Sequence, residues 1–432
     1  MSDFPLCEKC LNAQLETSSN YNIFYDLLIW ESDILRTKIF EKTNSVLKEK
    51  NIIKKVEDES SPYFNCYTIE LDPSMFPSLK SEEKVIIKSD GTSTYIAKDI
   101  ALQLLRLGIV SDGIKFRKYM KQKNNKFLYT TYSFEDKRKL RKSEEFKFEK
   151  GDKVINIIGS EQSYLQNLIK YIISQLDEEK SKNYIHLAYE HVVLPQEKFV
   201  GRLGTWIGYT ADELLEEGIR RAKAEIEKRV EKGESIKGTI SKKMSKREIE
   251  KIAKMVAIAA IKFPILRVSP TKQIIFDFDR NISFEGDTGP YLQYSCVRAG
   301  KILEKLRVEE EKKEEKKKKE EKEKQEKEKE KQEKENEIEE TKVKLTQEEK
   351  NLIKKILEFP SIIEKISKNY EYYILPNYAL NLADLFNVFY EKCHVVKSSG
   401  KIKEVRKKIV LAYYIVLKKS LELMGINVPE RM

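Results

Sequence analysis

Tyr95 and Asp99 stand at a spacing that suits the chemistry of a cationic ligand. They lie four residues apart in "KSDGTSTYIAKDIAL" (88–102), on one face of the turn from a strand to a helix. An aspartate in such a place can accept two parallel hydrogen bonds from a guanidinium group. A structural interpretation is equally available, in which Asp99 caps the helix "IALQLL" and Tyr95 is a strand aromatic. The local pattern leaves both interpretations open.

Lys242–Lys246 reads Lys-Lys-Met-Ser-Lys, a cluster of lysines that could hold a triphosphate. The segment leads directly into "REIEKIAKMVAIAAIKF", whose apolar residues have the spacing of an amphipathic helix. Ser245 is followed three residues later by Glu248, which is the pattern of a capping box. We therefore interpret the cluster as the capped start of a helix over 246–262.

The run "DKVINIIGS" (152–160) predicts a buried strand, and the helix "SYLQNLIKYIISQL" follows it. A strand, a glycine turn and a helix form the βα unit of a parallel sheet. Open α/β sheets bind ligands beyond the carboxyl ends of their strands. The segment from Gly159 to Gln162 is therefore a candidate ligand contact, although a surface turn is the alternative.

Other segments predict further elements by their periodicity. We expect two helices in 22–50, strands over 67–71, 84–88, 93–97 and 127–134, and helices over 99–107 and 211–232. Residues 309–342 are rich in Glu and Lys and have no apolar seam, so they predict a long exposed helix or a charged linker. The last ninety or so residues are apolar, aromatic and helical, as in a bundle.

Composition narrows the class of protein. The chain has 432 residues, enough for two or three domains, and a formal net charge of +11 that suits a polyanionic partner. The five cysteines are scattered, which favours a reducing compartment, and the single "CEKC" at 7–10 is a weak zinc signal. We expect no bound metal. With no signal peptide and no apolar run of membrane length, we expect a cytoplasmic protein without a membrane partner.

The segment "ISFEGDTGPYLQYSCVRAGKIL" (282–303) resembles the hinge of arginyl-tRNA synthetases, which are class I enzymes. Three further segments match the family in order. The stretch 88–102 resembles its Ser-Asp-Gly…Tyr-x-x-x-Asp segment, and the opening (7–34) resembles archaeal members within the catalytic domain. The chain end resembles the family's C-terminal bundle, including the final Pro-Glu-Arg-Met. The resemblance implies an arginine–tRNA ligase, which uses ATP with Mg²⁺, and no tightly bound cofactor.

The resemblance assigns roles to residues of the catalytic part. Asp99 would pair with the guanidinium of arginine, Tyr95 would hydrogen-bond or stack on it, and Gln162 would be a third contact. The order of segments places the ATP loop at "VGRLG" (200–204), about forty residues before the Lys-Lys-Met-Ser-Lys cluster. There Arg202 would contact the phosphates as the catalytic residue, and Gly204 would keep the backbone mobile.

The resemblance also assigns tRNA contacts, since aromatic side chains stack on splayed anticodon-loop bases. Tyr291 and Tyr294 match positions near the anticodon loop, as do Tyr378 and Met432. For each of the four, a core position or an ordinary terminus is the structural alternative. Arg298 would fix a phosphate or pair with Asp287 inside the hinge.

The implied fold is α/β plus all-α: the second half of a class I (Rossmann-type) catalytic domain, followed by a helical anticodon-binding bundle. We expect a partial catalytic domain over 1–285 with an insertion at about 112–150. A hinge helix over 286–308, a charged insertion over 309–342 and the anticodon-binding domain over 343–432 would follow.

The family's His-x-Gly-His signature does not occur in these 432 residues, which contain only His186, His191 and His394. We therefore expect the C-terminal two-thirds of the enzyme, either truncated or one piece of a split enzyme. Such a chain would be inactive in adenylation until a separate polypeptide supplied the other half. The alternative is a non-catalytic tRNA-binding or assembly protein derived from a synthetase.

Overall fold

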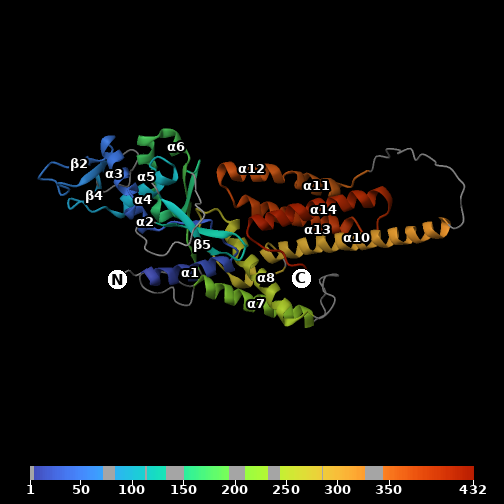
Figure 1. The fold of residues 1–432 in the computed structure, drawn as a ribbon. Coiled ribbons are helices and arrows are strands. Elements are labelled where there is room, and N and C mark those ends of the chain that lie inside the picture. The colour runs from blue at the N-terminus through green and yellow to red at the C-terminus, as the bar shows by residue number, and fades with distance from the viewer. Residues whose placement is uncertain are drawn as a thin grey trace. The chain divides into compact units, whose positions relative to one another are not determined.

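The computed structural model describes residues 4–71, 83–111, 114–132, 150–193, 210–231, 244–284, 286–325 and 344–432. The chain divides into two compact units (Figure 1). Unit 1 comprises residues 1–191 with 270–272, and unit 2 comprises 192–269 with 273–432. This division by packing differs from the functional boundaries expected at 285, 308 and 342, which stay predictions.

In its described residues, unit 1 mixes helices with three small sheets. Strands β2, β3 and β4 form an antiparallel sheet, β1 and β5 flank β6, and β7 pairs with β8 in parallel. The elements are α1 (Phe4–Asn20), β1 (Leu27–Leu28), α2 (Glu31–Arg36), α3 (Ile39–Glu49), β2 (Lys54–Lys55), β3 (Tyr67–Glu70), β4 (Glu83–Ile87), α4 (Tyr95–Arg106), β5 (Lys115–Lys121), β6 (Phe127–Tyr132), β7 (Val154–Gly159), η1 (Ser160–Gln162), α5 (Ser163–Leu176), α6 (Glu178–Lys182) and β8 (Tyr184–Tyr189).

The strand predicted over 93–97 is wrong, because α4 begins at Tyr95. Strand pairing ends at an isolated bridge between Ser93 and Ile87, and the Thr94 hydroxyl donates to the carbonyl of Ile86 at 3.0 Å. The composition Ser-Thr-Tyr-Ile-Ala suits a strand, but the helical face of Ile96, Ile100 and Leu104 is fully buried in the core. Helical periodicity therefore decides the element, and Asp99 lies inside the helix and does not cap it.

The parallel pair β7–β8 confirms the predicted βα unit but not the predicted burial of its first strand. Val154 and Asn156 point inward, whereas Ile155 and Ile157 are 41% and 67% exposed. Parallel sheets are usually covered on both faces. In the part of the chain that the structure describes, the outer face of this pair is left open.

Unit 2 is almost entirely helical. The short strands β9 (Val192–Val193) and β10 (Ile274–Ile275) pair in parallel. The helices are α7 (Ala211–Glu231), α8 (Lys246–Arg267), α9 (Phe278–Asn281), α10 (Gly289–Gln325), α11 (Gln347–Leu357), α12 (Phe359–Asn369), α13 (Ile374–Lys392) and α14 (Gly400–Leu423).

Aromatic packing joins the helices of unit 2. The rings of Phe386 on α13 and Tyr413 on α14 stack at 3.8 Å between centroids, 6° from parallel. The Tyr413 hydroxyl shares a hydrogen bond of 2.7 Å with Ser295 on α10, so its buried polar atom is satisfied. One cluster of apolar side chains thus fixes three helices around the bundle core.

Helices α8 and α10 approach each other at Gly289. A Cβ atom on this residue would lie 2.3 Å from the carbonyl oxygen of Ala259, so no other residue fits here without movement of a helix. The glycine of the hinge segment therefore sets the position at which α10 starts.

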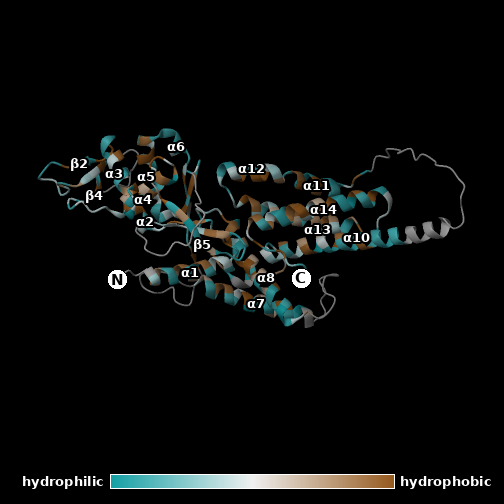
Figure 2. Ribbon diagram, viewed as in Figure 1, coloured by the Kyte–Doolittle hydropathy of each residue, from teal (hydrophilic) through white to brown (hydrophobic). Residues whose placement is uncertain are grey.

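The charged segment after Val308 continues α10 as far as Gln325, and its first turns are hydrophilic (Figure 2). Glu309 and Glu310 accept from Lys403 and Lys407 of α14 at 2.8 and 2.5 Å. The expected long helix is therefore present up to residue 325, and the rest of 309–342 lies outside the described residues. None of the described helices combines the length and apolarity that a membrane crossing requires.

The ion pair of Glu349 and Arg406 offers a test of the bundle. The Glu349 side chain is fully buried, and the guanidinium of Arg406 donates to it at 2.7 Å. Removing the carboxylate leaves a largely buried cation without its partner, so we expect Glu349→Leu to lower the free energy of unfolding by about 3 kcal/mol. Glu364→Gln breaks an exposed pair and should cost below about 1 kcal/mol. Denaturant unfolding of the two variants checks this, and equal losses would contradict it.

Candidate functional site

The predicted pair Tyr95 and Asp99 lies at the start of α4. Tyr95 is the first residue of the helix and is 67% exposed, and Asp99 follows one turn later and is half-buried. The spacing of four residues places both side chains on one face of the helix. The structure thus gives the pair the arrangement of an aromatic rim above a carboxylate.

The surroundings of Asp99 disfavour the ionised form of its carboxyl group. Burial raises its pKa, the neighbouring charge of Glu31 on α2 raises it further, and Lys98 and Arg106 oppose both effects. Lys98 is itself engaged, since its ammonium donates to Glu31 at 2.6 Å. Within the described residues, Asp99 forms no hydrogen bond or ion pair, so its oxygens are available to a cationic ligand. Glu31 was not singled out in the sequence, where only its place in the archaeal-like opening was a signal.

Behind α4, a buried polar network separates the helix from β7, β8 and α5. Arg106 donates to the Asn156 side-chain oxygen at 3.2 Å, and Asn156 donates to Gln166 Oε1 at 3.2 Å. The Tyr184 hydroxyl donates to the same Gln166 oxygen at 2.8 Å. The pKa of Arg106 is lowered by burial, while the nearby Tyr184 and Asp99 raise it.

Gln162 closes the turn after β7 and is exposed. It lies beyond the carboxyl end of a parallel strand, which is where sheets of this kind place ligand contacts. Burial raises the pKa of Tyr164, two residues later, and its proximity to Tyr95 raises it further, while α5 packs against α4. The structure therefore brings the turn bearing Gln162 near Tyr95.

The predicted ATP loop, with Arg202 and Gly204, lies outside the described residues, as do Lys242 and Lys243. The start of α8 is described and confirms the capping box, because Ser245 accepts from the Glu248 backbone and Glu248 accepts from the Ser245 backbone. Arg431 near the chain end also pairs with Glu248.

The hinge aromatics Tyr291 and Tyr294 are held by polar contacts. The Tyr291 hydroxyl donates to Asp384 at 2.9 Å and accepts from Asn387, and burial raises its pKa. Arg298 donates to the Tyr294 hydroxyl at 2.6 Å and to Asn387 at 2.7 Å. The pairing of Arg298 with Asp287 suggested by the sequence does not form, because Asp287 accepts from Arg267 at 2.7 Å.

Three of the four residues expected to contact tRNA have buried side chains. Tyr294, Tyr378 and Met432 are 6%, 3% and 5% exposed. Tyr378 donates to the Lys355 carbonyl at 2.9 Å, and Met432 packs in the same apolar cluster as Tyr294. In this structure their side chains pack inside the unit, and stacking on a base would require them to leave it.

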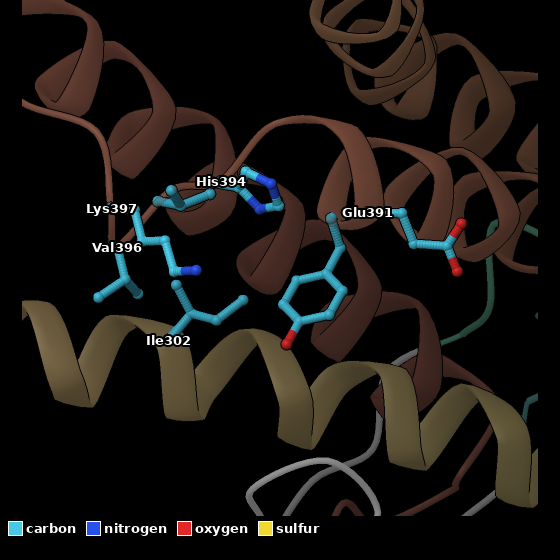
Figure 3. Close-up of a pocket in the computed structure, with 7 residues that line it drawn as sticks. Ile302, Glu391, His394, Val396 and Lys397 are labelled. Carbon is cyan, nitrogen blue, oxygen red and sulfur yellow. The ribbon is translucent and has the colours of Figure 1, made fainter.

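A pocket of about 390 Å³ opens beside Arg298 on the bundle surface. Figure 3 shows Lys397, Val396 and His394 gathered near Ile302 of α10, with Glu391 to one side. Tyr390 also lines the pocket, and the guanidinium carbon of Arg298 lies 5.0 Å from the Tyr390 ring centroid and 4.5 Å from that of Tyr294. Sequence reasoning missed this pocket, although Tyr390 and His394 show the same four-residue spacing as Tyr95 and Asp99.

The lysine cluster before α8 is open to test. Because Ser245 satisfies a helix N–H group, Ser245→Ala should lower the free energy of unfolding by about 1 kcal/mol. Lys246→Gln leaves the cap in place and should not change stability. If the cluster is a cap and not a phosphate loop, neither change alters the Kd for ATP measured by calorimetry. A large loss of ATP affinity in the stable Lys246 variant would favour the phosphate loop.

Comparison with known proteins identifies similar chains. Residues 325–432 match the family model described as DALR anticodon binding domain. The chain is 36% identical to an arginine–tRNA ligase of Thermococcus sibiricus and 34% identical to that of Pyrococcus furiosus. These alignments cover 99% of the chain and 60% and 61% of the relatives.

The Thermus thermophilus arginyl-tRNA synthetase has the same fold, with a TM-score of 0.77 and 28% identity over the whole chain and 64% of that structure. The expected fold class, a mixed α/β part followed by a helical anticodon-binding part, is confirmed. Along its whole length the chain is therefore similar in sequence and fold to arginine–tRNA ligases, of which it spans about 60%.

Proposed function

We propose that this chain supplies the arginine-binding and anticodon-binding parts of an arginine–tRNA ligase, which attaches arginine to its tRNA with ATP. One observation carries the proposal: in a chain similar to such ligases, Asp99 presents a half-buried carboxylate with no partner among the described residues. A carboxylate in this state needs a cation to offset its lost hydration.

Arginine meets this need through its guanidinium group. Asp99 would accept two parallel N–H···O bonds, which fixes the plane of the guanidinium. Tyr95 would cover that plane. Glu31 on α2, which is paired with Lys98, lies near enough to Asp99 to add negative potential there. Gln162 would contact the arginine from the turn after β7. Lysine, which carries a compact ammonium, cannot reproduce the bidentate contact.

We assign the binding of the ATP phosphates to the loop "VGRLG" (200–204). Arg202 would neutralise charge on the ATP phosphates, and Gly204 would let the loop move. Mg²⁺ would be carried to this reaction by the ATP phosphates. In the described ranges, no cluster of three or more His, Cys, Asp and Glu residues provides a metal site of its own.

The bundle pocket suits a base of tRNA. Tyr390 and His394 offer faces for stacking, Lys397 offers a charge for a phosphate, and Arg298 lies beside Tyr390. Tyr291 is partly exposed at the hinge and would contact the same loop, whereas the buried Tyr294, Tyr378 and Met432 would act by shaping the surface.

The open face of β7–β8 is a candidate surface for packing of the rest of a catalytic domain. Ile155 and Ile157 share this face with Ile185 and Leu187, the residues paired with them in register. A parallel pair with an apolar outer face is suited to further strands and a covering helix. We propose that the segment with the His-x-Gly-His signature, in the same or a separate polypeptide, packs here and is needed for adenylation.

The arginine pocket predicts the behaviour of Asp99→Asn. Loss of the charged acceptor should weaken L-arginine binding about tenfold or more, since a hydrogen bond to a charged group is worth about 1.5–3 kcal/mol. Because burial raises the Asp99 pKa, wild-type binding should fall with falling pH at a higher pH than for an ordinary carboxyl. Calorimetry across pH 4–8 checks both, with the exposed Glu41→Gln as control. Unchanged affinity in Asp99→Asn would remove Asp99 from the pocket.

Catalysis is tested by arginine-dependent exchange between ATP and pyrophosphate. We expect no exchange by the 432-residue chain alone and exchange when a polypeptide with the His-x-Gly-His half is added. Exchange by the chain alone would overturn the need for that half. Specific tRNA binding without exchange in either case would favour the non-catalytic tRNA-binding alternative.

The bundle pocket predicts a salt-dependent tRNA contact. Lys397→Gln should weaken tRNA binding and reduce the slope of log K against log salt by about 0.7–0.9, the effect of one phosphate contact. Lys354→Gln removes an equal charge from the exposed face of α11 and should leave the slope unchanged. Equal effects of the two changes would mean that only overall charge matters.

A further inference from the structure

Arg106 lies on α4 seven residues after Asp99, close enough for the two charges to influence each other. Two turns of one helix place both side chains on similar faces. Yet within the described residues no ion pair joins them. The guanidinium Nη1 of Arg106 instead donates to Asn156 Oδ1 at 3.2 Å and to Gln103 Oε1 at 3.5 Å.

The orientation of the Asn156 amide is imposed by its other partner. Its nitrogen donates to Gln166 Oε1 at 3.2 Å, which leaves its oxygen to face Arg106. The Gln166 oxygen is in turn fixed as an acceptor by the Tyr184 hydroxyl at 2.8 Å. The side chains of this network are buried, so water does not compete for the bonds.

The charges around Asp99 come from three elements. Glu31 on α2 disfavours the ionised carboxylate, while Lys98 and Arg106 on α4 favour it. Tyr184 on β8 is also close, since Asp99 is one of the causes that raise the pKa of its hydroxyl, after burial. Lys98 is paired with Glu31 at 2.6 Å. Arg106 is therefore a cation near Asp99 that is directed toward neutral amides.

We propose that Arg106 is a positioning residue of the arginine pocket, a cation kept near Asp99 by the Asn156–Gln166–Tyr184 network and kept from pairing with it. This inference rests on the proposed arginine site. A direct Arg106–Asp99 pair would occupy the carboxylate with an internal guanidinium, the same group that the ligand presents. Complete loss of Arg106 would leave Asp99 beside Glu31 with less compensating charge.

The proposal predicts opposite effects from two substitutions. Asn156→Leu removes the acceptor that holds Arg106, so Arg106 should turn to Asp99, lower its pKa and weaken L-arginine binding about tenfold by competition. Arg106→Leu should raise the Asp99 pKa. Adding Arg106→Leu to Asn156→Leu removes the competitor and should recover part of the affinity at pH 8. A purely structural network would not give shifts of opposite sign.

The experiment uses the full 432-residue chain with carboxyl-¹³C aspartate. NMR titration follows the Asp99 signal, which is assigned by its loss in Asp99→Asn, and calorimetry measures the Kd for L-arginine. Asn167→Leu, an exposed change on the same helix as Gln166, is the control. Tyr184→Phe removes only the hydroxyl and should act in the same direction as Asn156→Leu, so it carries the test if that variant unfolds in circular dichroism.

The outcomes separate the two proposals. Opposite pKa shifts with weaker arginine binding in Asn156→Leu support the positioning role. If the wild-type chain binds L-arginine but Asn156→Leu and Arg106→Leu leave the Asp99 pKa unchanged, or shift it in the same direction, the positioning role is overturned. If the wild-type chain does not bind L-arginine, the proposed arginine site fails, and the NMR titration still decides whether the network holds Arg106 away from Asp99.

Discussion

The contact between Gly289 and the Ala259 carbonyl fixes where α10 begins against α8 in the helical unit. With no space for a side chain, the backbones of α8 and α10 meet directly, and the direction of α10 is set from its first residue. That direction brings Ser295 to the hydroxyl of Tyr413 and places Arg298 between two tyrosine rings. The pocket at Ile302 follows one turn later on the same helix. The hinge is thus a fixed junction, and the position at which α10 starts determines where its later residues lie on the bundle surface.

In the α/β unit the corresponding local constraint is the hydration that Asp99 loses on burial. Among the described residues the nearby cations compensate it only in part, since Lys98 is paired with Glu31 and Arg106 is bonded to amides. Such an arrangement costs stability in the free protein and is a mark of a binding site more than of a fold. The network behind α4 is polar, although apolar side chains could be buried there at a lower cost in free energy. This is consistent with a role beyond packing.

Periodicity in the sequence predicted most elements, including α5, α7 and α8, and the capping box at Ser245. It failed at residues 93–97, where strand-forming side chains begin a helix because tertiary packing outweighs local preference. The pair Tyr95 and Asp99 was accessible through spacing and resemblance. Spacing could not reveal Arg106, Asn156 and Gln166, because their network joins four elements and leaves no pattern in any one segment of the sequence. The tRNA contacts expected at Tyr294, Tyr378 and Met432 show that a matching position does not reveal whether its side chain faces solvent or core.

The uncovered isoleucines of β7 also affect how the chain behaves at high concentration. Within the described residues β7 pairs on one side only, with β8, and an unpaired edge of an apolar strand is a template on which a second copy can add. The charged residues Asp152 and Lys153 directly before the strand, and Glu161 after it, have the position of gatekeepers that oppose such stacking. Added salt would screen these charges, so the same surface that suits a further strand or helix would limit the concentration at which the chain stays in solution without one.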